Sequence, residues 1–340
     1  MGQITNHWKT IVAAAFVAVS LTACGTASDG GSSKADNYPE KPLIITAPSG
    51  AGGGWDKTAR SVTKILGETK LVEQTMTVEN KPGGGGTVFL AEYVAKDNDD
   101  PYKLFVSSPP ILINNLKKEG NSPYGYKDVT PLAQITKDFG AIAVSADSKY
   151  NDLQALIDDI KADPTKVTLA GGSAPGSMDH LISVLPAFKS GIDPKTIKYL
   201  SYDGGGEAIA ALLGNNADAI GTDISSLGSY LKAGKIKILA VTSSERMDGD
   251  FKDVPTLMEL GLDTEFTIWR GVFGPKGMTE EQILFWDETF KTLSENETWK
   301  KELTANDWAS EYKNSADFKK FLDEQEADVQ ELLTALSMQK

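Results

Sequence analysis

The sequence has little of the chemistry on which catalytic and metal sites commonly depend. Its 340 residues include one cysteine, Cys24, and two histidines, His7 and His180. A single cysteine excludes an internal disulfide, and so few thiols and imidazoles cannot supply the clustered ligands of a zinc site. We find no carboxylate spacing that would replace them, and we therefore predict no metal.

Positive charge is also scarce. The formal net charge is −13, and only Arg60, Arg246 and Arg270 are arginines among the 34 basic residues. Nucleic acid and broad anionic membrane surfaces would repel such a protein, which excludes both as partners. The apolar fraction of 40% is ordinary for a globular protein, and the length allows two domains. If this protein binds an anion, local groups must attract it.

Long hydrophobic runs are rare, and the most prominent lies near the N-terminus. Lys9 is followed by IVAAAFVAVSL, which is too short for a helix to span the ~30 Å apolar core of a bilayer but suits a signal peptide. Residues 21–25, LTACG, which begin with the last residue of this run, resemble a bacterial lipobox, although an incidental Cys24 is the alternative. We predict a signal peptide over residues 1–23, lipidation of Cys24 by chains such as palmitate, and a flexible tether over 24–37. This would place the protein outside the cytoplasm, anchored to the cell membrane.

From residue 42 onward, short β-rich runs alternate with runs of helical period, which is typical of an α/β fold. After FTIWRGVFG, at 266–274, the chain is predicted to be mostly helical, with capping boxes at 279–282 and 294–297. A division into first and second halves is the simplest, but the final helices need a sheet to cover. We therefore predict a discontinuous domain 1 over 38–139 and 265–340, and a domain 2 over 140–264.

Three glycine-rich stretches, at 50–54, 171–177 and 204–206, each lie between a predicted strand and a predicted helix. Helix N-termini offer free N–H groups and a positive dipole end, and glycine lets a ligand approach the backbone. Each stretch alone could be a plain turn, but three in one context favour a shared anion site. Asp56 stands where a phosphate-binding loop needs glycine, and Trp55 stands where a dinucleotide fingerprint needs a small residue. We therefore predict no nucleotide and no other cofactor.

An enzyme is disfavoured by the surroundings of its one candidate base, His180. Ser177 lies three residues earlier and could touch it, but Asp179 is adjacent and would point elsewhere. The nucleophile pattern G-x-S-x-G also fails at Pro175. We favour a solvated or helix-capping His180 and predict no catalytic residues.

Two arginines have readily stated interpretations. Arg60 lies four residues after Asp56, which predicts an ion pair along a helix. Arg270 could reach a cleft and bind a carboxylate with its forked guanidinium, or it could form an exposed ion pair. Trp55 and Trp269 could line the same cleft or belong to the core.

Seven segments in order resemble the substrate-binding proteins of tripartite tricarboxylate transporters, the Bug-type receptors. They are YPEKPLIITAPSGAGGGWD, VENKPGGGGTVFLAEYVAK, GGSAPGSMDHL, YDGGGEAIAALLGNNADAIGTD, LKAGKIKILAVTSSERM, VPTLMELG and WRGVFGP. The resemblance implies a type II periplasmic-binding-protein fold, a monomer with two α/β domains flanking a ligand cleft. It also implies that the protein closes over a carboxylated solute and delivers it to a permease with a large and a small membrane subunit.

The resemblance also implies which residues contact the solute. Carried over by position, the expected contacts are Ser49, Gly52, Gly53, Gly54, Trp55, Gly205 and Gly206, with Ser173, Ala174 and Ser177 facing the ligand and Ser107 or Ser108, Asp223 and Arg270 as further candidates. Family members commonly have an aromatic at the place of Ser49 and a small hydroxyl residue at that of Trp55, so pocket shape should differ here. The resemblance implies a solute among tricarboxylates, dicarboxylates, amino acids and aromatic acids, and we expect one of the first three. A lipid-anchored sensory module is the alternative, and a hydrolase ranks third.

Overall fold

The computed structural model describes residues 38–52, 54–119, 122–202 and 204–340. The predicted signal peptide, the lipidation of Cys24, the tether and the contact at Gly53 fall outside these residues. Within them, no helix is long and apolar enough to span a membrane.

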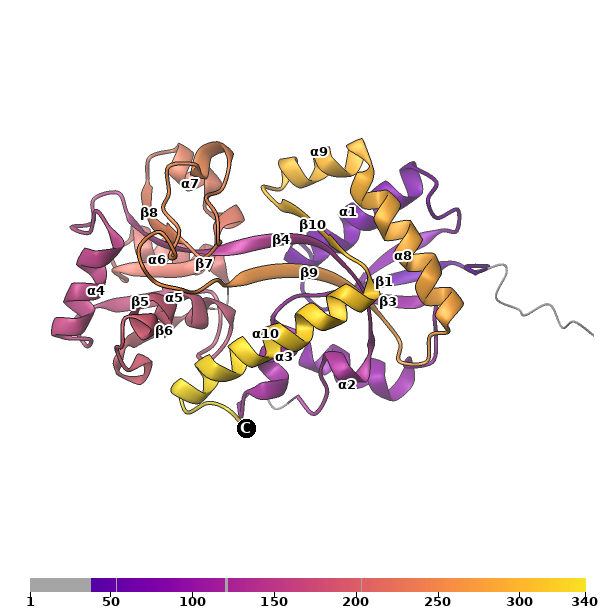
Figure 1. Ribbon diagram of the computed structural model, residues 1–340, viewed down its shortest axis with the longest axis horizontal. Helices are drawn as coiled ribbons and strands as arrows, with labels where there is room; N and C mark the ends of the chain where they lie inside the picture. The colour runs from indigo at the N-terminus through magenta and orange to yellow at the C-terminus, as the bar shows by residue number, and fades with distance from the viewer. Residues whose placement is uncertain (1–37, 53, 120–121, 203) are drawn as a thin grey trace, which may run out of the picture. The chain divides into compact units, whose positions relative to one another are not determined.

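Strands and helices alternate along the chain as predicted (Figure 1). The strands are β1 (Leu43–Ala47), β2 (Met76–Asn80), β3 (Lys103–Ser107), β4 (Thr130–Ser145), β5 (Thr168–Gly171), β6 (Lys198–Ser201), β7 (Ala219–Asp223), β8 (Ile236–Val241), β9 (Thr267–Gly274) and β10 (Ala309–Lys313). The α-helices are α1 (Gly54–Glu68), α2 (Thr87–Lys96), α3 (Pro110–Leu116), α4 (Leu153–Ala162), α5 (Met178–Lys189), α6 (Gly205–Leu213), α7 (Gly228–Lys232), α8 (Glu280–Glu295), α9 (Glu297–Ala305) and α10 (Ser315–Ala335). The predicted α/β class is therefore confirmed.

The strands follow the order β2-β1-β3-β9-β4-β7-β5-β6, with β8 and β10 also paired to β4. Strands β1, β2 and β3 pair in parallel at one end, and β5, β6 and β7 pair in parallel at the other. Most of these strands are short apolar runs, because parallel strands covered by helices on both faces are buried on both sides. The carboxyl ends of the parallel strands lead into the glycine-rich loops, which is where ligand crevices form in open α/β sheets.

Two long strands, β4 and β9, run side by side through the middle of the view in Figure 1. Residues 130–139 of β4 pair with β9, whereas from Gly140 onward β4 pairs with β7 and β8. A side chain at Gly140 would collide with Ile182, since an added Cβ would lie 2.9 Å from its Cγ2 atom. The change of partners coincides with the crossing predicted near Phe139, and the division into domains stays a prediction.

The C-terminal region differs from its prediction in two details. A strand, β10, interrupts the helices and pairs with β4. The capping box at Thr279 and Gln282 is confirmed, but the one at 294–297 is wrong. Helix α8 continues through Ser294, and Asn296 caps α9 by accepting from the Thr298 N–H at 2.8 Å. An asparagine two residues later thus provides the N-cap for which a serine was expected.

Candidate functional site

One cleft of about 1120 Å³ collects nearly all the predicted contacts. Its lining includes twelve of them: Ser49, Gly52, Gly54, Trp55, Ser108, Ser173, Ala174, Ser177, Gly205, Gly206, Asp223 and Arg270. Of the two serines at the end of β3, Ser108 lines the cleft and Ser107 lines a smaller neighbouring pocket. Residues far apart in sequence are thus brought to one place.

The three glycine-rich loops occupy the predicted positions between strand and helix. The first joins β1 to α1, the second joins β5 to α5, and the third joins β6 to α6. The second and third loops touch through their backbones, because an added Cβ at Gly172 would lie 2.2 Å from the Gly205 nitrogen. Each of these helices begins at or just beyond the cleft, and its first N–H groups have no carbonyl one turn earlier. In α5 the Asp179 N–H is taken by Ser173 Oγ, so α1 and α6 are the better anion sites.

The buried carboxylate of Asp56 holds the first loop in shape. It accepts hydrogen bonds from the Gly52 N–H at 2.8 Å, from Asn80 Nδ2 at 2.8 Å and from Arg60 Nε at 3.0 Å. Burial favours a higher pKa for Asp56, but these bonds and the Arg60 charge outweigh it and hold the pKa at about 2. The predicted Asp56–Arg60 pair is confirmed. The Gly52 N–H donates to Asp56, so it does not remain free for a solute. Gly52 instead shapes the loop through its left-handed backbone conformation, with φ of +81°.

Arg270 extends from β9 into the cleft and lies against the N-terminus of α1. Its residue surface is 8% exposed, so the exposed ion pair considered above is wrong. An added Cβ at Gly54 would lie only 2.9 Å from Arg270 Nη2, which places the guanidinium against the first residue of that helix. The buried Nε has no hydrogen-bond partner, and no carboxylate lies within 4.0 Å of the guanidinium among the residues described. A buried guanidinium without an acceptor is a site for an anionic ligand.

The charge of this guanidinium acts on Asp138, which shares one serine with Asp223. Ser225 Oγ lies 2.6 Å from Asp138 Oδ2 and 3.0 Å from Asp223 Oδ2. Asp138 is fully buried on β4 and also accepts from the Phe139 N–H. Burial, reinforced by the negative charge of Asp223, raises the pKa of Asp138 to about 7, although the Ser225 and Phe139 bonds and the Arg270 charge oppose the rise. In the folded protein, Asp138 therefore gains its negative charge only as the pH rises through about 7.

We expect Asp138→Asn to stabilise the protein above neutral pH. The asparagine side chain can still accept from the Phe139 N–H, and its amide can donate to Ser225 Oγ. The Ser225 hydroxyl can then donate its own proton to Asp223. Since the Asp138 pKa is about 7 in the folded state and near 4 when unfolded, the native state binds the extra proton. Wild-type stability should therefore fall through this pH range. We define the difference as the unfolding free energy of the variant minus that of wild type. This difference should be larger at about pH 8 than at about pH 4, by on the order of 2–4 kcal/mol.

Chemical denaturation at a series of pH values measures this difference, and Asp263→Asn, at an exposed acid, is the matched control. A wild-type to variant difference that is independent of pH would contradict the prediction. Carboxylate affinity provides a second measurement, because removing the Asp138 charge beside Arg270 should strengthen binding at about pH 8.

The second loop is held by buried side chains of α5 and by the half-buried Tyr199 of β6, whose hydroxyl donates to the Ser173 carbonyl at 2.9 Å. The Asp179 carboxylate accepts from the Gly172 N–H at 2.7 Å, and Ser173 Oγ accepts from the Asp179 N–H at 3.0 Å. His180 is 4% exposed and its Nδ1 accepts from the Gly176 N–H at 2.8 Å. The expected solvated His180 is therefore wrong; burial, with the nearby Lys117 charge, lowers its pKa to about 4, so the ring is neutral. It supports the loop that precedes α5.

Lys117, at the end of α3, lines the cleft although the sequence interpretation missed it. The residue is 4% exposed, and its Nζ donates to Ser177 Oγ at 2.9 Å and to the Pro175 carbonyl at 3.2 Å. Burial lowers its pKa. No local signal distinguishes it, because LKKEG is an ordinary charged segment and Lys118 beside it is exposed.

Trp55 forms one wall of the cleft, whereas Trp269 does not reach it. The Trp55 Nε1–H donates to Ser108 Oγ at 2.9 Å, and the ring packs over Gly86. Trp269 is fully buried and packs against Phe273 and Phe318. Of the two alternatives for Trp269, the core is therefore correct and the cleft is wrong.

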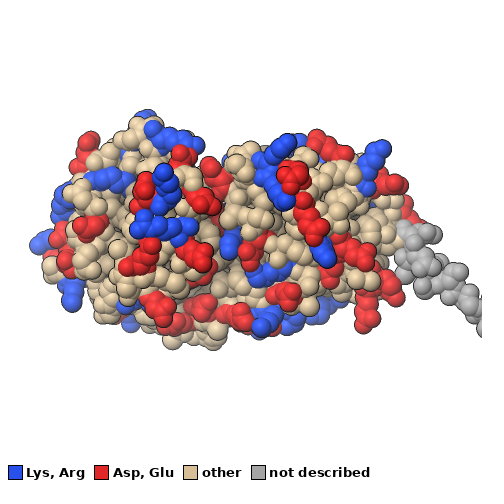
Figure 2. All heavy atoms as spheres, turned by 45° about the horizontal axis from the view of Figure 1, so that its top comes forward, with Lys and Arg blue, Asp and Glu red and all other residues tan. Residues whose placement is uncertain are grey.

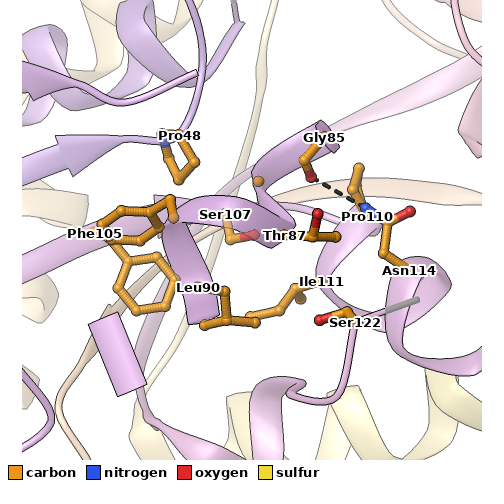
Figure 3. Close-up of a pocket in the computed structure, with 12 residues that line it drawn as sticks. Pro48, Gly85, Thr87, Leu90, Phe105, Ser107, Pro110, Ile111, Asn114 and Ser122 are labelled. Atoms are coloured by element: carbon orange, nitrogen blue, oxygen red, sulfur yellow. Dashed lines mark hydrogen bonds between the residues drawn. The ribbon is translucent and has the colours of Figure 1, made fainter. Parts of the chain in front are cut away.

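A small side pocket adjoins the cleft beneath the glycines of η1 (Gly84–Gly86) (Figure 3). Phe105, Leu90 and Ile111 give it an apolar wall, and Asn114 Nδ2 donates to the Gly85 carbonyl at 3.1 Å. Gly85 and Asn114 line the cleft as well.

The face of the molecule shown in Figure 2 has no large patch of basic side chains. Figure 2 shows basic and acidic side chains interspersed on the face in view. In the described parts of the chain, no three His, Cys, Asp or Glu side chains are grouped so that they could hold a metal. The positive character needed for an anion therefore comes from within the cleft.

Comparison with known proteins identifies similar sequences and folds. Residues 58–338 match the sequence model of the family described as "Tripartite tricarboxylate transporter family receptor". Protein BugT of Bordetella pertussis is 31% identical over 255 residues, which are 74% of this chain and 75% of that protein.

Two solved structures extend the likeness. A TctC solute binding protein from Polaromonas superposes with a TM-score of 0.71 at 25% identity, over 88% of this chain and 99% of that chain. The R. palustris protein Rpa4515, solved with adipate, superposes with a TM-score of 0.77 at 22% identity, over 89% and 99% of the two chains. The predicted periplasmic-binding fold is thereby confirmed.

Proposed function

This chain belongs to the tripartite tricarboxylate transporter receptor family, and on that premise we propose that it captures a small organic carboxylate and delivers it to a two-component membrane permease. The family consists of extracytoplasmic solute-binding receptors, which agrees with the prediction that the chain is not an enzyme. One similar protein, Rpa4515, was solved with adipate, a dicarboxylate.

The observation that carries this proposal is the unpartnered, buried guanidinium of Arg270 beside the first residue of α1. A carboxylate placed there would accept two parallel bonds from Arg270 and further bonds from backbone N–H groups of the helix. The Arg270 charge and the helix N–H groups both act only within the cleft. A protein with a net charge of −13 needs such local groups to attract an anion.

We also propose how the cleft closes. The predicted domains, 38–139 with 265–340 and 140–264, would carry the first glycine loop and the other two loops, respectively. Because β4 and β9 run from one set of partners to the other, small rotations along them would bring these loops together on the solute. The protein would act as a monomer, held to the membrane through lipidated Cys24.

Calorimetric titration of the purified protein against succinate, adipate, citrate and glutamate tests the proposal. We expect at least one of these carboxylates to bind with micromolar or tighter affinity, equivalent to about −8 kcal/mol, and inorganic phosphate to bind more weakly. Absence of binding by every carboxylate would overturn the proposal.

Replacing Gly205 with valine is expected to weaken carboxylate binding about tenfold while the fold is retained. The new Cβ would make only an ordinary contact, 3.5 Å from Thr222 Oγ1, but the side chain would occupy the approach to the N-terminus of α6. Titration measures the affinity and thermal unfolding checks the fold. Gly67→Val, on the exposed side of α1 with nothing within 4 Å, is the control. Equal affinities in the two variants would remove the third loop from the site.

A further inference from the structure

We infer that Lys117 is a second anion contact in the cleft and that it selects a dicarboxylate, whose one carboxylate meets Arg270 and whose other meets Lys117. The inference rests on the proposed function, because it specifies the solute of the same cleft. It concerns a residue that neither the motifs nor the glycine loops indicate.

The first support is the environment of the ammonium group. Lys117 is 4% exposed, and among the residues described no carboxylate oxygen lies within 4.0 Å of its Nζ. Both of its hydrogen-bond acceptors, the Pro175 carbonyl and Ser177 Oγ, are neutral. Glu119, which also lines the cleft, acts on this charge only from beyond 4.0 Å. A buried ammonium without a carboxylate in contact is costly, and a bound anion would reduce that cost. Since an ammonium carries three protons, one remains for the solute.

The second support is the position of Lys117 relative to Arg270. Arg270 contacts Gly54, at the start of α1, whereas Lys117 contacts the second loop through Pro175 and Ser177. Both line the same cleft. A monocarboxylate could neutralise only one of these two separated cations, but a dicarboxylate could neutralise both.

The third support is that the Lys117 side chain is held in place. An added Cβ at Gly176 would lie 2.8 Å from Lys117 Cδ, so the second loop packs against the aliphatic stem. On its other side, Lys117 forms a β-bridge with Gln339, near the C-terminus. A fixed ammonium is a more selective contact than a mobile surface lysine, because less side-chain freedom is lost on binding.

The test compares dicarboxylates with monocarboxylates of equal carbon number. Wild type, Lys117→Gln and Lys117→Arg are titrated with succinate, glutarate, adipate and pimelate, and with butyrate, pentanoate, hexanoate and heptanoate. We expect wild type to prefer its best dicarboxylate at least about tenfold over the matched monocarboxylate. In Lys117→Gln, dicarboxylate affinity should fall about ten- to a hundredfold and monocarboxylate affinity should stay within about twofold; Lys117→Arg should recover part of the preference.

Lys118→Gln, at the exposed neighbouring residue, is the matched control and should retain the wild-type preference. Equal losses for both acid classes in Lys117→Gln would make Lys117 a structural support and overturn the inference. A wild-type protein that binds monocarboxylates as tightly as dicarboxylates would overturn it while leaving the proposed function intact, and this outcome needs no folded variant. If wild type binds neither class, the inference fails; the proposed function fails with it only if citrate and glutamate do not bind either.

Discussion

Replacing Arg270 with methionine is expected to lower carboxylate affinity by about a hundredfold. The guanidinium is buried, its Nε has no partner, and it lies against the first residue of α1. Charge-assisted bonds to a carboxylate contribute about 1.5–3 kcal/mol, and about 3 kcal/mol corresponds to roughly a hundredfold in affinity. Arg270→Lys should lose about tenfold, because lysine keeps the charge but not the two parallel donors.

Titration calorimetry with adipate or the best-bound acid measures these affinities, and thermal unfolding shows whether each variant is folded. Arg246→Met is the matched control, since Arg246 forms an exposed ion pair with Glu259 at 2.9 Å. We expect it to bind like wild type. If Arg270→Met and Arg246→Met had the same affinity, Arg270 would have no part in solute binding.

The three glycine loops could be predicted from sequence because their signals are local. Each combines a short apolar strand, a glycine cluster and the start of a helical period, and the structure has a strand, a loop and a helix at each place. The Asp56–Arg60 pair is similarly local, at one helical turn. The ordered segments then indicated that these loops face one another, which no single loop could do.

The roles of Arg270 and Lys117 depend on contacts between distant segments. All eight residues of β9 are buried, so the alternation that usually separates the two faces of a strand could not show where Arg270 points. Lys117 lies in a charged segment and is buried only because the second glycine loop and the C-terminal residues pack around it. The burial of His180, which was expected to be solvated or to cap a helix, could not be predicted for the same reason, since Tyr199 and the Gly176 N–H reach it only in the folded chain.

Introducing a single methyl group at Gly172 is expected to be the most disruptive small change in the cleft. The Cβ of Gly172→Ala would lie 2.2 Å from the Gly205 nitrogen and 2.3 Å from the Gly204 carbonyl carbon. Both atoms belong to the backbone, so no side-chain rotation can relieve the overlap and the second and third loops must separate. Overpacking of this kind costs about 1–3 kcal/mol, and we expect a lower unfolding temperature and at least a tenfold loss of carboxylate affinity.

Gly204→Ala is the matched control for the overlap at Gly172. Gly204 belongs to the third loop, but an added Cβ there would have nothing within 4 Å. Its φ of −167° is extended backbone that alanine also adopts, so both the unfolding temperature and the affinity should stay near wild type. Wild-type affinity in Gly172→Ala would mean that the two loops can separate without harming the site, and each would then have to bind the solute independently. A loss confined to Gly172→Ala would instead show that the two loops act as one surface, fixed by direct backbone contact.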